Sequence, residues 1–406
     1  MKPTHLIYCA ISFAITIVQT GCVTSQRPVF SNQVYPQYPS VLTAAVIDQV
    51  TVQNHPQGQS AILNADGSIV IFYYSNGQFN ADRLESNLKG ATSLASGRFD
   101  LKTGSWGYVV ASPSDPRVAY VAGNAIAPVY STLGNDILPV ATVAGDFNRD
   151  GSLDLAVLDT NGNVDVCLGN GDGSFKPASQ TFKVGAATCI ACASLRSKSP
   201  NLDLITSGSG DVDVLLGNGD GSFQAPQYVN GYGYFGGTPA NHPGRVLVKD
   251  FNGDGFQDLA VLGTYSNNVG ILFGTDDGIH YNSAQFYAVY PPVARGVVAD
   301  MAAGDFNGDG VQDLAITVPD GQLIILVGNK GGSFQGYYVL PDTEGAPAGK
   351  VWSPNAIAAG HFYGSQRDDL LVLDLFKNPG LNAPGSAVYG AWLLRAQEPE
   401  VFWRFN

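Results

Sequence analysis

Several residue types are scarce in this chain of 406 residues, and each scarcity excludes a class of protein. Lys and Arg number 21 against 34 Asp and Glu, a formal net charge of −13, which argues against a nucleic-acid binder because such binders cluster basic residues. Five cysteines are too few for a disulfide-stapled scaffold. After the N-terminus no stretch reaches the roughly 18 apolar residues that a membrane-spanning helix needs.

The residues that are abundant favour a folded, strand-rich chain. Hydrophobic residues make up 45%, enough to bury a large core, which excludes a mainly disordered state. Gly (49) and aromatics (11%) are frequent, whereas Met (2) is rare. This composition is typical of many short strands joined by tight turns, and no convincing long helical pattern is found.

The first 21 residues have the pattern of an export signal. A lead with one Lys precedes an apolar run at 6–18, which is followed by Gln19, Thr20, Gly21 and Cys22. This ending resembles the lipobox of bacterial lipoproteins, with Gln19 where that family has an aliphatic residue. The resemblance implies lipidation at Cys22, a membrane-anchored tether over 22–42, and a place in the cell envelope as an outer-membrane or surface lipoprotein. The alternative is ordinary cleavage and secretion.

The remainder of the chain is built of repeats. The pattern Gly-Asp-Phe-Asn-x-Asp-Gly-x-x-Asp-Leu-Ala occurs from Gly145 and Gly304, and with a leading Lys from Lys249. A second signature, Gly-Asn-Gly-Asp-Gly-Ser-Phe in its fullest form, begins at glycines 169, 217, 274 and 328. Spacings near 50 residues are typical of propellers rather than of leucine-rich or ankyrin repeats.

Degenerate copies extend the pattern to seven units. Their expected bounds are 43–88, 90–134, 138–185, 186–230, 244–290, 296–340 and 353–405. Each unit reads as four short strands separated by Gly, Asn and Asp, and in the third unit these fall at 141–145, 154–159, 163–168 and 175–184. The sequence therefore predicts an all-β fold, a seven-bladed β-propeller of four-stranded antiparallel blades over 43–406.

The two signatures resemble the FG-GAP/VCBS repeats of integrin α-subunit propellers and of many bacterial secreted proteins. The resemblance is specific in three units and partial in four. It implies that the loop between the first and second strands of an intact unit holds Ca²⁺.

The chemistry of the intact loops supports the same expectation. Oxygen side chains fall at positions 1, 3, 5 and 9, and a backbone carbonyl at position 7 adds another donor, which is the hard oxygen set that Ca²⁺ takes. We therefore predict about three Ca²⁺ ions, held by Asp146, Asn148, Asp150, Ser152 and Asp154; by Asp250, Asn252, Asp254, Phe256 and Asp258; and by Asp305, Asn307, Asp309, Val311 and Asp313. The alternative is that Asp, Asn and Gly only form a good turn through local hydrogen bonds.

Other copies of the motifs are weaker. The loops at Ser194–Asp203 and at His361 to Asp369 lack most ligand oxygens, so we expect no metal there. Asp172 and Asp220 are read as turn residues because glycines flank each of them.

The remaining residues give no catalytic constellation. No His falls in a recognised motif, so an enzyme is not predicted. Cys189 and Cys192 have CxxC spacing on an apolar strand. Buried free thiols, a disulfide from Cys167 to one of the pair, and a redox-active pair are the alternatives.

A long aromatic and Gly-rich segment is the candidate ligand loop. It contains Tyr228, Tyr232, Tyr234 and Phe235, and we expect it on the face opposite the calcium loops. Exposed aromatics suit a protein or glycan ligand, although packing between blades is the alternative. The preferred hypothesis is an adhesion or binding module with a monomeric body; a scaffold for envelope assembly and a polysaccharide-acting enzyme are the alternatives.

Overall fold

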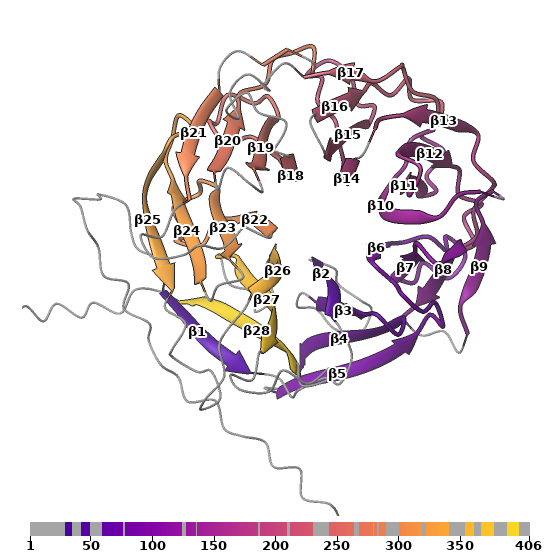
Figure 1. Cartoon of the computed structure of the whole chain (residues 1–406), viewed down its shortest axis with the longest axis horizontal. Helices are drawn as coiled ribbons and strands as arrows, with labels where there is room; N and C mark the ends of the chain where they lie inside the picture. The colour runs from indigo at the N-terminus through magenta and orange to yellow at the C-terminus, as the bar shows by residue number, and fades with distance from the viewer. Residues whose placement is uncertain are drawn as a thin grey trace, which may run out of the picture.

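The computed structural model describes residues 29–34, 42–48, 59–75, 78–123, 127–134, 136–185, 187–208, 212–229, 243–263, 268–278, 280–281, 284–289, 300–318, 322–340, 354–360, 367–376 and 388–397. These residues form seven antiparallel sheets of four strands each. The sheets stand around a common centre as the blades of a propeller (Figure 1). The predicted fold class and number of blades are confirmed.

The first four blades follow the predicted units closely. Blade 1 comprises β2 (Leu42–Asp48), β3 (Gln59–Asn64), β4 (Ser68–Ser75) and β5 (Gln78–Glu85), and blade 2 comprises β6 (Ser93–Gly97), β7 (Gly107–Ser112), β8 (Asp115–Ala122) and β9 (Val129–Thr132). Blade 3 comprises β10 (Pro139–Gly145), β11 (Asp154–Asp159), β12 (Asn163–Cys167) and β13 (Gln180–Lys183). Blade 4 comprises β14 (Ala187–Ala193), β15 (Asp203–Gly208), β16 (Val212–Leu215) and β17 (Gln227–Tyr228).

The last three blades complete the ring. Blade 5 comprises β18 (Pro243–Lys249), β19 (Asp258–Gly263), β20 (Asn268–Leu272) and β21 (Ala284–Ala288). Blade 6 comprises β22 (Asp300–Gly304), β23 (Asp313–Val318), β24 (Gln322–Gly328) and β25 (Phe334–Leu340). Blade 7 comprises β26 (Pro354–Gly360), β27 (Asp369–Phe376), β28 (Val388–Gln397) and β1 (Val29–Val34).

Blade 7 corrects two expectations. Its unit supplies only three strands, and the fourth is β1, which pairs antiparallel with β28 from Val29 opposite Gln397 to Val34 opposite Trp392. Residues 29–34 therefore belong to the propeller rather than to the predicted tether over 22–42. Pairing the two ends of the chain satisfies the backbone of the outer edge of β28, which would otherwise be open.

The hydrophobic core lies between neighbouring blades. The second strands β7, β11, β15, β19 and β23 are buried along their whole length, as their nearly continuous apolar sequences predict. One cluster joins blades 5 and 6 through Phe251, Leu262, Met301 and Ile316, and similar clusters join the blades from 1 to 5 in sequence.

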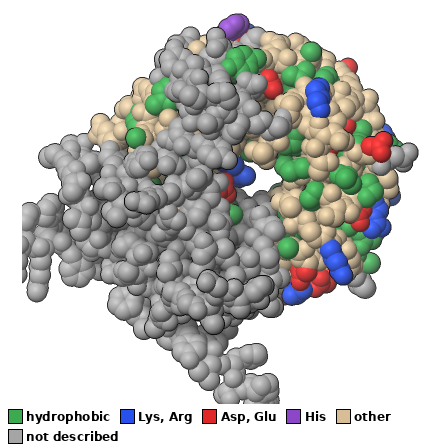
Figure 2. Space-filling model, in the orientation of Figure 1, with side chains coloured by type: hydrophobic (Ala, Val, Ile, Leu, Met, Phe, Trp, Pro, Cys, Tyr) green, Lys and Arg blue, Asp and Glu red, His purple; other side chains and the backbone are tan. Residues whose placement is uncertain are grey.

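The fourth strand of blade 3 is shorter than predicted. The segment 175–184 forms only an isolated bridge at Phe175, opposite Gly169, before β13 begins at Gln180. The described residues contain no helix long and apolar enough to cross a membrane. Figure 2 shows acidic and basic side chains scattered among one another over the described part of the face in view.

Candidate functional site

The three predicted calcium loops connect the first and second strands of blades 3, 5 and 6. The glycine at position 6 of each loop has a left-handed backbone, with φ of 88° at Gly151, 89° at Gly255 and 81° at Gly310. Side chains other than Gly rarely adopt this conformation, so the glycine fixes the sharp turn that folds positions 1 to 5 back on themselves.

The oxygens at positions 1 and 3 converge in every intact loop. In blade 3, the backbone N–H of Asp150 lies 3.1 Å from Asp146 Oδ1 and 2.9 Å from Asn148 Oδ1. The equivalent distances are 3.2 and 2.9 Å at Asp254 and 3.1 and 2.9 Å at Asp309. The position-5 carboxylate accepts hydrogen bonds from the position-3 amide and from the position-7 N–H, for example from Asn148 Nδ2 at 2.8 Å and Ser152 N at 2.8 Å.

The carboxylate at position 9 has a different environment. Asp154, Asp258 and Asp313 are fully buried, and each accepts two backbone hydrogen bonds. One donor is the Phe at position 2 and the other is the glycine that leads the second signature, as in Asp154 with Phe147 N at 2.9 Å and Gly169 N at 2.8 Å. Position 9 therefore ties the loop to the end of the third strand of its own blade.

Burial dominates the ionisation of these position-9 carboxyls. Loss of solvent, with a smaller contribution from neighbouring loop carboxylates, raises the pKa of Asp258 to about 6 and that of Asp313 to about 8. Burial also raises the pKa of Asp154. The backbone donors oppose this shift in all three cases because they favour the charged form.

The donor set fits Ca²⁺ at positions 1, 3 and 5, whose oxygens lie close together. These residues are exposed or partly exposed, except for the buried Asn307. The described residues contain no group of three or more His, Cys, Asp or Glu gathered as a metal site. The hydrogen bonds within each loop are also those that the turn alternative predicts. The calcium assignment therefore stays a prediction.

The degenerate loop of blade 4 keeps only the buried carboxylate. Asp203 accepts hydrogen bonds from Leu195 N at 3.1 Å and Gly217 N at 2.8 Å, the same two backbone positions as in the intact loops. Arg196 reaches the same carboxylate, 2.6 Å from Oδ1, and donates to the carbonyl of Gly217 at 2.6 Å. The guanidinium of Arg196, the residue that corresponds to Asn148 of blade 3 in the repeat, therefore places a positive charge inside this loop. Sequence analysis missed this pair because the loop was read only as a loss of ligands.

Each loop also touches the next blade. Phe147 O accepts a hydrogen bond from Gly221 N at 3.0 Å, and the ring of Phe147 meets Phe223 edge-on with centroids 5.4 Å apart. Phe251 and Phe334 repeat this pairing at 6.1 Å between blades 5 and 6. The acidic loops and the turns of the second signature therefore lie on one face and together form a joint between blades.

The turns of the second signature have the predicted backbone. Gly171 and Gly173 have φ of 68° and 83°, and Gly219 and Gly221 have φ of 83° and 85°. Asp172 and Asp220 each accept hydrogen bonds from the N–H and hydroxyl of the Ser two residues on. These contacts agree with their interpretation as turn residues.

The described cysteines are free thiols, and the described part of the loop between the first two strands of blade 7 contacts blade 6. Cys167, Cys189 and Cys192 are free, and burial raises the pKa of Cys167 to about 12 and that of Cys192 to about 11, which disfavours the reactive thiolate. In blade 7, Asp368 Oδ2 accepts a hydrogen bond from Asp305 N at 2.9 Å. His361 lies outside the described residues.

The candidate ligand loop is described only at its start. Tyr228, in β17, is 47% exposed. Tyr232, Tyr234 and Phe235 lie outside the described residues, so their assignment to a ligand stays a prediction.

Comparisons with known proteins agree with the fold and the loops. The FG-GAP-like repeat family matches residues 146–193, 200–261 and 250–316, and the FG-GAP repeat matches 297–352. These segments contain all three acidic loops. A ring of antiparallel four-stranded blades defines a β-propeller, and within that class the chain is an FG-GAP repeat protein. No curated protein sequence matches the chain.

Solved propellers have the same arrangement of strands. BBS1N in complex with ARL6DN aligns with a TM-score of 0.57 at 13% identity, over 90% of this chain and 98% of that chain. The Myceliophteria thermophila Cps50 (Swd1) β-propeller domain gives 0.53 at 11% identity, over 89% and 99%. An Agrocybe aegerita lectin that recognises non-reducing terminal N-acetylglucosamine gives 0.50 at 16%, over 79% and 81%. These identities show a shared fold alone.

Proposed function

We propose that this FG-GAP propeller is an exported, calcium-binding module of the cell envelope that recognises a protein or glycan ligand. The observation that carries the calcium part is the repeated convergence of the position-1 and position-3 oxygens in three loops of one ring. The carboxylates of such a loop repel one another, so the folded loop is stable only if a cation or solvent offsets that repulsion.

When bound, Ca²⁺ would supply positive charge to each loop and join its ends. Asp146, Asn148 and Asp150, with their counterparts in blades 5 and 6, would hold the ion by side-chain oxygens. The Phe at position 2 already packs on the next blade, so an ordered loop also stabilises the joint between two blades. The role proposed for the metal is therefore structural.

The binding role is supported by the fold and by similar solved propellers, one in complex with a protein and one that recognises a terminal sugar. The proposed ligand loop contains Tyr228, which is exposed, together with Tyr232, Tyr234 and Phe235. The export part is supported by residues 1–22 of the sequence, where Cys22 is the proposed lipid attachment site.

Three measurements test this function. Calorimetric titration of the purified protein should give about three Ca²⁺ per chain, one per intact loop; no heat and no thermal shift with chelator would remove the calcium assignment. Membrane fractionation of Cys22→Ser in the producing cell should show release of the protein, and unchanged fractionation without lipid on the wild type would remove the anchor. A glycan and protein-partner screen with wild type and Tyr234→Ala then tests the ligand loop.

A further inference from the structure

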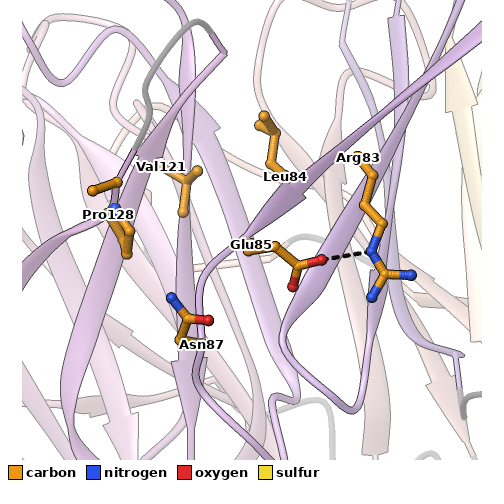
Figure 3. A pocket seen from close by; sticks show the side chains of 7 residues that line it. Arg83, Leu84, Glu85, Asn87, Val121 and Pro128 are labelled. Atoms are coloured by element: carbon orange, nitrogen blue, oxygen red, sulfur yellow. Dashed lines mark hydrogen bonds and ion pairs between the residues drawn. The ribbon is translucent and has the colours of Figure 1, made fainter.

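A pocket of about 250 Å³ lies between the outer parts of blades 1 and 2. Arg83, Leu84 and Glu85 of β5 form one side, and Val121 of β8 with Pro128 forms the other (Figure 3). Asn87 stands between these two sides. The site combines an apolar wall with a carboxylate, a guanidinium and a carboxamide, the composition expected of a pocket for a small polar ligand.

A contact of Tyr130 holds the two blades together beside this pocket, and Arg117 lies against the ring of Tyr130. The hydroxyl of Tyr130, in β9, donates to the carbonyl of Ser86 at 3.0 Å, so blade 2 is tied to the backbone between two lining residues. Arg117 lies 4.7 Å from the centre of the Tyr130 ring and pairs with Asp115 at 2.8 Å. Val129 and Tyr130 remain 39% and 38% exposed, which places apolar and aromatic surface next to Pro128.

Asn87 is one of two non-glycine residues with a positive φ among the described residues, at 58°. Asn tolerates this conformation better than most side chains, whereas Gly adopts it without strain. The carboxamide can therefore be removed by changing Asn87 to Gly without straining the backbone. An outward-facing amide in the wall of a pocket offers both donors and an acceptor to a ligand.

The charges beside the pocket select against anions. Arg83 Nε lies 2.6 Å from Glu85 Oε1, and Arg83 Nη2 lies 3.2 Å from Asp66 Oδ2. One positive and two negative groups give 1 − 2 = −1. A phosphate or a carboxylate would be repelled, while hydroxyl groups could both donate to Glu85 and accept from Asn87.

We propose that this pocket binds one pyranose ring of a neutral sugar or hexosamine. The volume lies below the roughly 300–1,000 Å³ of pockets for drug-sized ligands and suits a single ring. The C–H face of the ring would lie against Leu84, Val121 and Pro128, and its hydroxyls would meet Glu85 and Asn87. The inference rests on the proposed binding function, for which it names a ligand class and a site separate from the Tyr232 to Phe235 loop.

The test uses saturation-transfer NMR on the full-length protein. The probes are the methyl glycosides of glucose, galactose, mannose, N-acetylglucosamine and glucosamine, with glucuronate as the anionic comparison. At least one of the neutral or amino sugars should give a signal and glucuronate none. Asn87→Gly keeps the backbone conformation and removes the carboxamide, and Glu85→Gln replaces a charged acceptor by a neutral one. Each should weaken binding by up to about tenfold, the first through a lost hydrogen bond and the second through a weakened one.

A matched variant separates the pocket from general surface charge. Asp82 lies on the same strand and is exposed, but it is not among the lining residues, so Asp82→Asn should bind like the wild type. Equal weakening in Asp82→Asn, or unchanged binding in both Asn87→Gly and Glu85→Gln, would overturn the proposal.

Two outcomes separate this site from the proposed function. If sugar binding is lost in Tyr234→Ala and kept in Asn87→Gly, the sugar sits in the other loop, so the pocket proposal is wrong while the binding module stands. If no probe binds the wild type at 10 mM, roughly the weak end of measurable affinity, the pocket proposal is again wrong. The screen for protein partners still tests the module in that case.

Discussion

The loop between the first and second strands occupies an equivalent place in blades 3 and 4. Each of the two loops contains a buried carboxylate, but the groups around that carboxylate differ between the blades. In blade 3, Asp154 is accompanied by further loop oxygens from Asp146 and Asp150, a set for which calcium is the proposed counter-charge. In blade 4, Asp203 has Arg196 at 2.6 Å instead. Both loops keep the same two backbone donors to the buried carboxylate.

The difference shows which part of the repeat belongs to the fold. Position 9 is a structural acceptor in blades 3, 4, 5 and 6, with or without further candidate ligands in the loop. Positions 1, 3 and 5 are an addition that only blades 3, 5 and 6 carry in full. The proposed calcium dependence should therefore be confined to three blades, and blade 4 provides an internal control.

The largest expected effect is that of removing calcium from all three loops. A ligand that binds only the folded state at a hundredfold excess over Kd contributes about 2.7 kcal/mol per site, so three sites give roughly 8 kcal/mol of unfolding free energy. Urea unfolding curves recorded in calcium and in chelator measure this difference in unfolding free energy. Identical unfolding curves would mean that the three acidic loops need no metal.

The next effect is the loss of the internal cation in blade 4. Arg196→Ala leaves the fully buried Asp203 without its charged partner, which typically costs about 3 kcal/mol or more. Because the loop lacks other ligand oxygens, calcium should not restore the stability. The control is Lys198→Ala, for which we expect a change near zero in the free energy of unfolding. Lys198 is 88% exposed and lies 3.6 Å from Asp276, so this ion pair is at the surface. Recovery of Arg196→Ala by calcium would remove the contrast between the two kinds of loop.

A single carboxylate of blade 6 tests one site alone. Asp309→Ala removes the position-5 ligand, so the calcium-dependent part of stability should fall by about 2–3 kcal/mol at a hundredfold excess over Kd. Titration should then give one fewer ion. Asp276→Ala, an exposed carboxylate of blade 5 outside its loop, serves as the control. An unchanged number of ions in Asp309→Ala would contradict the ligand assignment.

The buried carboxyls predict a pH dependence in the calcium-free protein. Burial raises the pKa of Asp313 to about 8 from its ordinary value of 3.8, so between these values the folded state binds more protons than the unfolded state. Stability should therefore fall as pH rises through this window. Asp258, with its pKa raised to about 6, contributes only to the lower part.

Urea midpoints in chelator at pH 5, 6.5 and 8 measure this dependence. In Asp313→Asn the fall between pH 6.5 and 8 should be reduced, because Asn does not titrate. Stability that rises across the whole window in the wild type would contradict the assignment of these buried carboxyls.

The smallest effect concerns position 4 of the loops. Arg149 has φ of 61° in blade 3, where blades 5 and 6 have Gly253 and Gly308 at 77° and 79°. Arg149→Gly should therefore raise stability by up to about 1 kcal/mol. A left-handed backbone costs a non-glycine residue roughly 1–2 kcal/mol, and the larger conformational entropy that Gly loses on folding offsets part of this gain. Thermal unfolding measures the change, and a lower melting temperature would show that the Arg149 side chain itself stabilises the loop.

Much of the fold could be predicted because each blade carries its own local signals. Alternating apolar and Gly/Asn/Asp-rich segments identify the strands, and Gly151, Gly171 and Gly173 mark turns that require positive φ. The repeat period of the two signatures then gives the number of blades. The acidic loops were recognisable for the same reason, since all their candidate ligands lie within nine residues of sequence.

The tertiary structure decided what depends on contacts between distant residues. It placed β1 beside β28, set the ring of Phe147 against that of Phe223 in the next blade, and brought Arg83 and Glu85 opposite Val121. No local pattern encodes these pairs, because they arise only when seven sheets pack around a ring and the sequence of one blade meets that of the next. Local propensity and spacing therefore determined the blades and their acidic loops, whereas packing between blades decided how the ring closes and where the outer pocket lies.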